Sequence, residues 1–179
     1  YLKVAPSTVT STSTSGARTR NTRNVYPMTS RAFSPNRPST GNIQNASGGA
    51  WNITFSGISN PLAVTVVNSG AINYNHSGTF NTFFPFTNNG VLNINSGQWH
   101  FNNSAVTNTG ELHMEPNTVI QVNVATTLSS TSSITGAGTI RIANTLTQNF
   151  PWIVSNQAVE LIGGTWNGSG AISFAPPGV

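Results

Sequence analysis

The chain has 179 residues, and only 6% of them are charged, whereas about a quarter is usual in soluble domains. It contains no Asp and no Cys. Their absence excludes calcium-loaded nonapeptide repeats, a disulfide framework and a thiolate metal site. No apolar run approaches the length of a membrane-spanning helix, so we expect no membrane span.

Residues 1–45 differ from the rest of the chain because they are rich in Ser, Thr and Pro and lack an apolar period. This composition is typical of a segment that does not fold alone, so we predict an extended N-terminal arm. The arm has no acidic residue and carries six of the seven basic residues: Lys3, Arg18, Arg20, Arg23, Arg31 and Arg37. We expect it to link the protein to neighbouring copies of itself. Anionic cell-surface polysaccharide and nucleic acid are the alternative partners.

A short phrase is repeated three times between Val66 and Val122, with its glycines twenty residues apart. The three copies are Asn68-Ser69-Gly70-Ala71-Ile72-Asn73-Tyr74, Asn88-Asn89-Gly90-Val91-Leu92-Asn93-Ile94 and Asn108-Thr109-Gly110-Glu111-Leu112-His113-Met114. Weaker copies lie around Gly49, Gly138 and Gly170. A fixed period near twenty residues predicts a repeat architecture in which each copy forms one coil.

Apolar and polar residues alternate after each glycine, which predicts a half-buried β-strand. Two apolar columns are expected to face the interior. The first is Ile72, Leu92, Leu112, Ile140 and Ile172, and the second is Val66, Phe86, Val106, Ile134 and Trp166. A third column includes Phe80, Trp99 or Phe101, and Ile120 with Val122. Each unit therefore holds about three short strands separated by Asn, Ser, Gly and Thr turns.

A lone unit of this size cannot bury its apolar face, so successive units must stack. Parallel crossovers are nearly always right-handed. We therefore predict an all-β, right-handed parallel β-helix, or β-solenoid, of about six coils over residues 46–179. The glycines are expected in turns that need positive φ. The alternative is an antiparallel β-sandwich, which also has many short strands.

The spacing between glycines changes in the second half of the chain. It lengthens across residues 123–137, so we expect a loop or a lengthened turn to leave the rod there. The next interval contains Phe150-Pro151-Trp152, and Pro151 predicts an edge strand or a bulge because it cannot donate to a central ladder. Alternation breaks there and at Phe83-Phe84-Pro85-Phe86, so we expect an exposed ring in each segment.

Few residues in the chain have the chemistry that a catalytic site needs. Glu111, His113 and Glu115 lie at i, i+2 and i+4, so they share the outer face of one strand. We interpret them as a solvated charge cluster, with Arg141 beside Glu111 or Glu115 on the next coil, rather than as a catalytic or metal site. No catalytic residue, metal ligand or cofactor is predicted. Five Asn-x-Ser/Thr sequons, relevant only in a eukaryotic secreted protein, lie at Asn45, Asn52, Asn75, Asn102 and Asn167.

The low charge, the absence of Cys and the repeated Asn-x-Gly-x-Leu/Ile-x-Ile phrase resemble the β-helical repeat regions of large bacterial surface proteins. These include filamentous-haemagglutinin-like adhesins and autotransporter passengers. The resemblance covers about residues 46–174. It implies an extracellular or cell-surface structural protein, a fibre subunit or adhesin segment that assembles through its arm and its solenoid ends. A coat-like protein that binds nucleic acid and a carbohydrate-active β-helix are the alternative interpretations.

Overall fold

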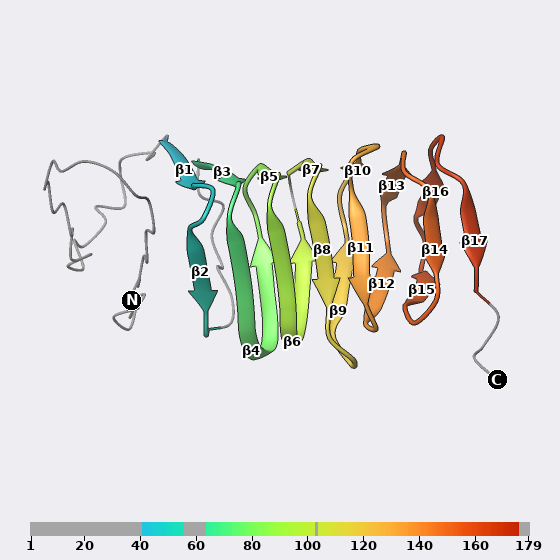
Figure 1. The fold of residues 1–179 in the computed structure, drawn as a ribbon, viewed down its shortest axis with the longest axis horizontal. Helices are drawn as coiled ribbons and strands as arrows, with labels where there is room; N and C mark the ends of the chain where they lie inside the picture. The colour runs from blue at the N-terminus through green and yellow to red at the C-terminus, as the bar shows by residue number, and fades with distance from the viewer. Residues whose placement is uncertain (1–40, 56–63, 103, 176–179) are drawn as a thin grey trace, which may run out of the picture.

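The computed structural model describes residues 41–55, 64–102 and 104–175, and their regular secondary structure is entirely β-strand. Every strand pair among these residues is parallel. The strands follow one another along a rod of about six coils (Figure 1). The predicted β-solenoid is therefore confirmed, and the antiparallel β-sandwich is excluded.

One wall of the solenoid is a seven-stranded sheet in the order β1-β3-β5-β7-β10-β13-β16. Its strands are β1 (Gly41–Asn45), β3 (Val64–Asn68), β5 (Phe86–Asn88), β7 (Val106–Asn108), β10 (Thr126–Leu128), β13 (Thr145–Gln148) and β16 (Thr165–Asn167). Because β1 pairs with β3, the solenoid already includes residues that the sequence assigned to the arm. The rest of the predicted arm lies outside the described residues.

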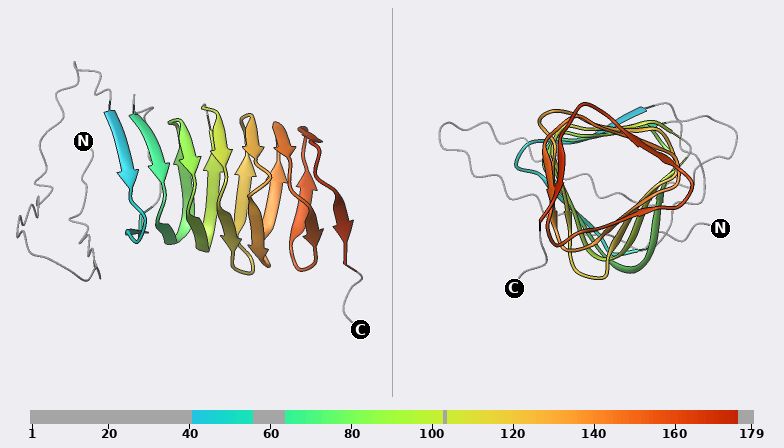
Figure 2. Two further views of the ribbon diagram at one scale, coloured as in Figure 1. Left: turned by 45° about the horizontal axis from the view of Figure 1, so that its top comes forward. Right: turned by 90° about the vertical axis from the view of Figure 1, so that its right-hand side faces the viewer.

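An eight-stranded sheet forms the other walls. Its strands are β2 (Ala50–Ile53), β4 (Ala71–Thr82), β6 (Val91–Phe101), β8 (Glu111–Met114), β9 (Val119–Val122), β11 (Ser133–Gly136), β12 (Thr139–Ile142) and β15 (Ala158–Leu161). The first half of the long strand β6 pairs with β8 and its second half with β9, so the sheet divides into two walls. A separate two-stranded sheet joins β14 (Trp152–Val154) and β17 (Ile172–Phe174). Viewed along the axis, the coils outline a closed, roughly triangular tube (Figure 2).

The inward column of the seven-stranded sheet keeps a spacing of twenty residues from Val66 to the last coil. It contains Ile43, Val66, Phe86, Val106, Thr126, Leu146 and Trp166. The prediction that Ile134 belongs to this column was wrong. The residue that follows Val106 in this column is Thr126, which is buried and whose polar side chain hid the column in the sequence.

Ile134 instead continues the first predicted column, in which Ile72, Leu92 and Leu112 pair in register and Leu112 pairs with Ile134. The assignment of Ile140 to that column was also wrong. Ile140 pairs with Ile120 on a different wall. The error arose because residues 123–137, predicted to form a loop, contain β10 and β11.

Ile172 does not lie in the first inward column, where the sequence predicted it. It pairs with Trp152 in the two-stranded sheet and is 40% exposed, because β17 is the last strand among the described residues. Phe150 and Trp152 are both buried, so the exposed ring predicted at Phe150-Pro151-Trp152 is absent. Both aromatic side chains belong to the core.

The glycines of the repeated phrase are required by close approach and not by positive φ. Gly70, Gly90 and Gly110 are not among the described glycines with positive φ. A Cβ on Gly90 would overlap the carbonyl oxygen of Gly70, and one on Gly110 would overlap that of Gly90. Successive turns therefore stack backbone against backbone.

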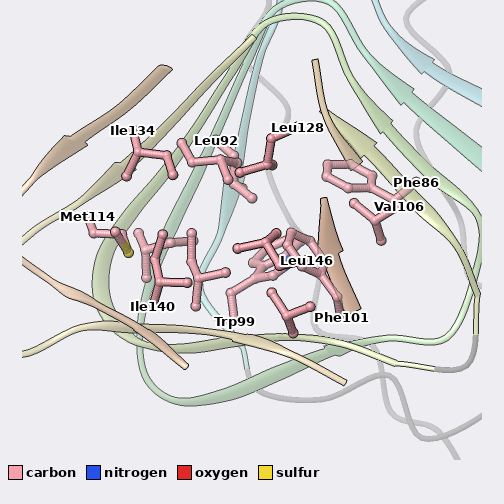
Figure 3. Close-up of a cluster of buried hydrophobic side chains, with 14 of the residues drawn as sticks. Phe86, Leu92, Trp99, Phe101, Val106, Met114, Leu128, Ile134, Ile140 and Leu146 are labelled. Carbon is pink, nitrogen blue, oxygen red and sulfur yellow. The ribbon is translucent and has the colours of Figure 1, made fainter. Parts of the chain in front are cut away.

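The core is one continuous apolar cluster along the axis (Figure 3). Large side chains from different walls meet in it, and the rings of Phe80 and Trp99 stack with centroids 4.3 Å apart. Leu92, Ile94 and Met114 are completely buried. This burial along the interior supplies the main apolar stabilisation of the rod.

Candidate functional site

A ladder of asparagine side chains runs inside the solenoid. It is formed by the last residues of β1, β3, β5 and β7 in the seven-stranded sheet. The Nδ2 of Asn45 donates to Oδ1 of Asn68 at 2.7 Å, Asn68 to Asn88 at 2.6 Å, and Asn88 to Asn108 at 2.7 Å. All four side chains are buried. They stack because their coils are in register and because Asn recurs every twenty residues from Asn68 to Asn108.

Each ladder amide also donates to a backbone carbonyl. Asn45, Asn68 and Asn88 reach the carbonyl oxygens of Ala71, Val91 and Glu111 at 2.9–3.0 Å. Buried amides cost little free energy only when their hydrogen bonds are made. The ladder therefore fixes the register between coils and ties each turn to the next.

The structure also bears on the predicted sequons. The Asn45 side chain is 2% exposed and is engaged in the ladder, so this sequon is not accessible on the folded chain. Asn52, Asn75 and Asn167 lie at the surface, and Asn102 is half-buried with its amide bonded to Asn81. The asparagine ladder was not predicted, although the recurrence of Asn in the repeated phrase indicated it.

The charged cluster predicted on β8 lies on the outer face. His113 Nε2 is 3.3 Å from Glu115 Oε1, and His113 Nδ1 is 2.7 Å from the Thr135 hydroxyl. That hydroxyl donates to Glu111 Oε1 at 2.5 Å. Within the residues that the structure describes, no group of three or more His, Asp or Glu is arranged to hold a metal ion.

Arg141 does not lie beside Glu111 or Glu115, as the sequence predicted. Its Nε donates to Glu160 Oε2 at 2.6 Å. The reason is the register, because Arg141 pairs with Gln121 and Glu160 on the wall of β9, β12 and β15. Both side chains are partly exposed, so this ion pair stabilises the fold little.

His100 stands in the same outward column as Gln121 and Arg141. Its Nε2 lies 2.9 Å from Oε1 of Gln98. Burial, and then the positive charge of Arg141, lower its pKa from the ordinary value of 6.5. Protonation of the His100 ring therefore lowers the free energy of unfolding.

We expect the free energy of unfolding to fall as the pH falls from about 6.5 through the lowered folded-state pKa of His100. In that window the unfolded chain binds the proton more readily than the folded chain. Thermal unfolding should show a lower midpoint at about pH 5 than at about pH 7.5, and His100→Gln should remove part of the difference. An unchanged difference in the variant would contradict this assignment.

The two ends of the described solenoid expose apolar side chains. At the C-terminal end, Phe174 is 68% exposed and Leu161 is 60% exposed, and Ile162 is also exposed. At the other end, Ile43 and Phe55 are exposed. The last strands of the sheets, β15, β16 and β17, have no further strand to pair with among the described residues.

Comparison with models of protein families, with curated proteins and with solved structures found no match. No helix long and apolar enough to cross a membrane occurs in the part of the chain that the structure describes. The fold therefore defines the structural class of the protein, a parallel β-solenoid with an interior asparagine ladder and with exposed apolar side chains at both ends of its described part.

Proposed function

We propose that this protein is an extracellular structural protein, a fibre subunit or adhesin segment that assembles with copies of itself through its N-terminal arm and its solenoid ends. The observation that carries the proposal is the exposure of apolar side chains at both ends of the described solenoid. The resemblance of the repeated phrase to bacterial surface β-helices supports the same class.

The terminal strands support end-to-end contact for a second reason. An edge strand presents backbone N–H and C=O groups that another strand can pair with. At the C-terminal end these groups are accompanied by Leu161 and Phe174, whose exposed surface is costly to leave in water. The end of a second copy would pair with these backbone groups and would also bury the exposed apolar side chains.

The second copy is expected to bind head to tail, because the two ends of a solenoid are different surfaces. The inward column that ends at Trp166 would continue with Ile43 of the next copy, as it does between coils within the chain. A contact of this kind does not close on itself unless the subunits rotate into a ring, so it generates filaments.

The basic arm is proposed to strengthen this contact. Its six cations, at Lys3, Arg18, Arg20, Arg23, Arg31 and Arg37, contrast with residues 46–179, which contain one Arg and three Glu. Attraction between oppositely charged parts of neighbouring copies is screened by salt. Added salt should therefore weaken the contribution of the arm more than that of the apolar ends.

The test is sedimentation and negative-stain electron microscopy of the full chain and two variants. We expect the full chain to form filaments. We expect Leu161→Lys combined with Phe174→Lys to remain folded and unassembled. The matched control is Ile153→Lys, because Ile153 is equally exposed but points outward from the side of β14. Filaments from the end variant, or none from the full chain, would contradict the proposal.

Deletion of residues 1–40 tests the arm separately. The truncated chain should keep its β-sheet circular dichroism and assemble less than the full chain. Undiminished assembly would refute the linking role of the arm. Ultraviolet absorbance above the protein's own, lost on this deletion, would instead favour the coat-like function in which the basic arm binds nucleic acid.

A further inference from the structure

We propose that the outer face of the seven-stranded sheet binds the surface of ice. The central strands of this sheet, β5, β7, β10 and β13, each place one Thr outward between two buried residues: Thr87, Thr107, Thr127 and Thr147. Strand pairing puts these four threonines directly over one another. Their hydroxyl groups therefore repeat about every 4.8 Å along the rod.

A second polar row lies beside the first, two residues after each threonine and one residue past the end of each strand: Asn89, Thr109, Ser129 and Asn149. The backbone ladder continues to these positions, since the N–H of each donates to the strand of the preceding coil. The second row begins the turns that follow the strands, and within it the Thr109 hydroxyl donates to Oδ1 of Asn89 at 2.7 Å. The face thus presents a regular row of threonine hydroxyls, flanked by a row of polar turn residues, on a backbone held by parallel pairing.

Several hydroxyls of the first row are available to water. Among the hydrogen bonds between described residues, the Thr147 hydroxyl bonds to Asn167 at 2.9 Å, whereas the hydroxyls of Thr87, Thr107 and Thr127 have no side-chain partner. Water oxygens on the faces of hexagonal ice repeat at a distance close to the spacing between the rungs of the first row. One hydrogen bond exchanged with liquid water gains little, so binding to ice needs many such contacts at once on a rigid, matching surface.

The charge distribution supports the same ligand. The charged side chains of the described residues, Glu111, Glu115, Arg141 and Glu160, all belong to the other walls or their turns. The residues that flank the threonine row on its other side are small and uncharged: Pro85, Ala105, Ala125 and Thr145. An ionic group would hold its own hydration shell and disrupt an ordered water layer. The outer face of the seven-stranded sheet carries no ionic group among the described residues. Its strands lie side by side along the rod (Figure 2, left).

A neutral polysaccharide is the competing ligand for an uncharged face. Sugar rings usually bind on aromatic side chains, which supply a flat apolar surface. On the seven-stranded sheet the aromatic side chains Phe86 and Trp166 belong to the inward column. The outward rows offer hydroxyl, amide and methyl groups instead, which favours ice.

The test measures adsorption of the fluorescently labelled full chain to a growing ice hemisphere, together with the gap between melting and freezing temperatures of a single ice crystal. We expect adsorption and a faceted crystal. The variant Thr107→Tyr with Thr127→Tyr should adsorb about tenfold less, since two adjacent rungs lose their contacts. Thr107→Val with Thr127→Val removes the hydroxyls at nearly constant shape and should also reduce adsorption.

The matched control is Thr79→Tyr with Thr139→Tyr, because both threonines point outward from the eight-stranded sheet. This control should adsorb like the unmodified chain, and thermal unfolding should verify that all variants are folded. No adsorption by the unmodified chain, equal adsorption by the folded tyrosine variant, or loss in the control would overturn the proposal. Binding to insoluble cellulose or chitin without adsorption to ice would overturn it in favour of a polysaccharide.

Discussion

Leu92→Asp is expected to unfold most of the solenoid. The Leu92 side chain is completely buried in the column between Ile72 and Leu112. A carboxylate there would have no hydrogen-bond partner, and we expect the free energy of unfolding to fall by more than about 4 kcal/mol. Chemical denaturation followed by circular dichroism measures the change.

The matched control is Asn93→Asp, one residue further along the same strand. Asn93 points outward and is half-buried, and its amide donates to Oδ1 of Asn73 at 2.7 Å. Loss of this partly exposed hydrogen bond should cost only about 1 kcal/mol. Equal losses in the two variants would show that the interior and exterior faces of β6 are wrongly assigned.

Asn88→Ala is expected to have the second largest effect. Asn88 is completely buried, accepts a hydrogen bond from Asn68, and donates to Asn108 and to the carbonyl of Glu111. Its removal leaves polar groups above and below without partners and opens a cavity. We expect the free energy of unfolding to fall by about 3 kcal/mol.

A second asparagine pair provides the control for this prediction. Asn95 donates to Asn75 at 2.8 Å with both side chains exposed on the outside. Asn95→Ala should change the free energy of unfolding by no more than about 0.5 kcal/mol, because water replaces the lost partner. If both alanine variants lose the same stability, the interior ladder does not hold the coils in register.

The sequence predicted the fold class from its period, and it located the interior side chains best where the repeat is regular. Leu92 and Leu112 show why, since their fixed offset from the glycines leaves one register that buries both. The ion pair of Arg141 shows the limit. Alternation along a strand tells which face a residue occupies, but it does not tell which strand lies beside it.

The sequence by itself therefore determined the parallel solenoid and its period of about twenty residues. The tertiary structure alone decided the register of residues 123–174, because Thr126 is polar and still occupies an apolar column. It also decided that Asn68, Asn88 and Asn108 point inward. Asparagine is usually an exposed residue, and its burial here is favourable only because stacking coils supply every amide with a partner.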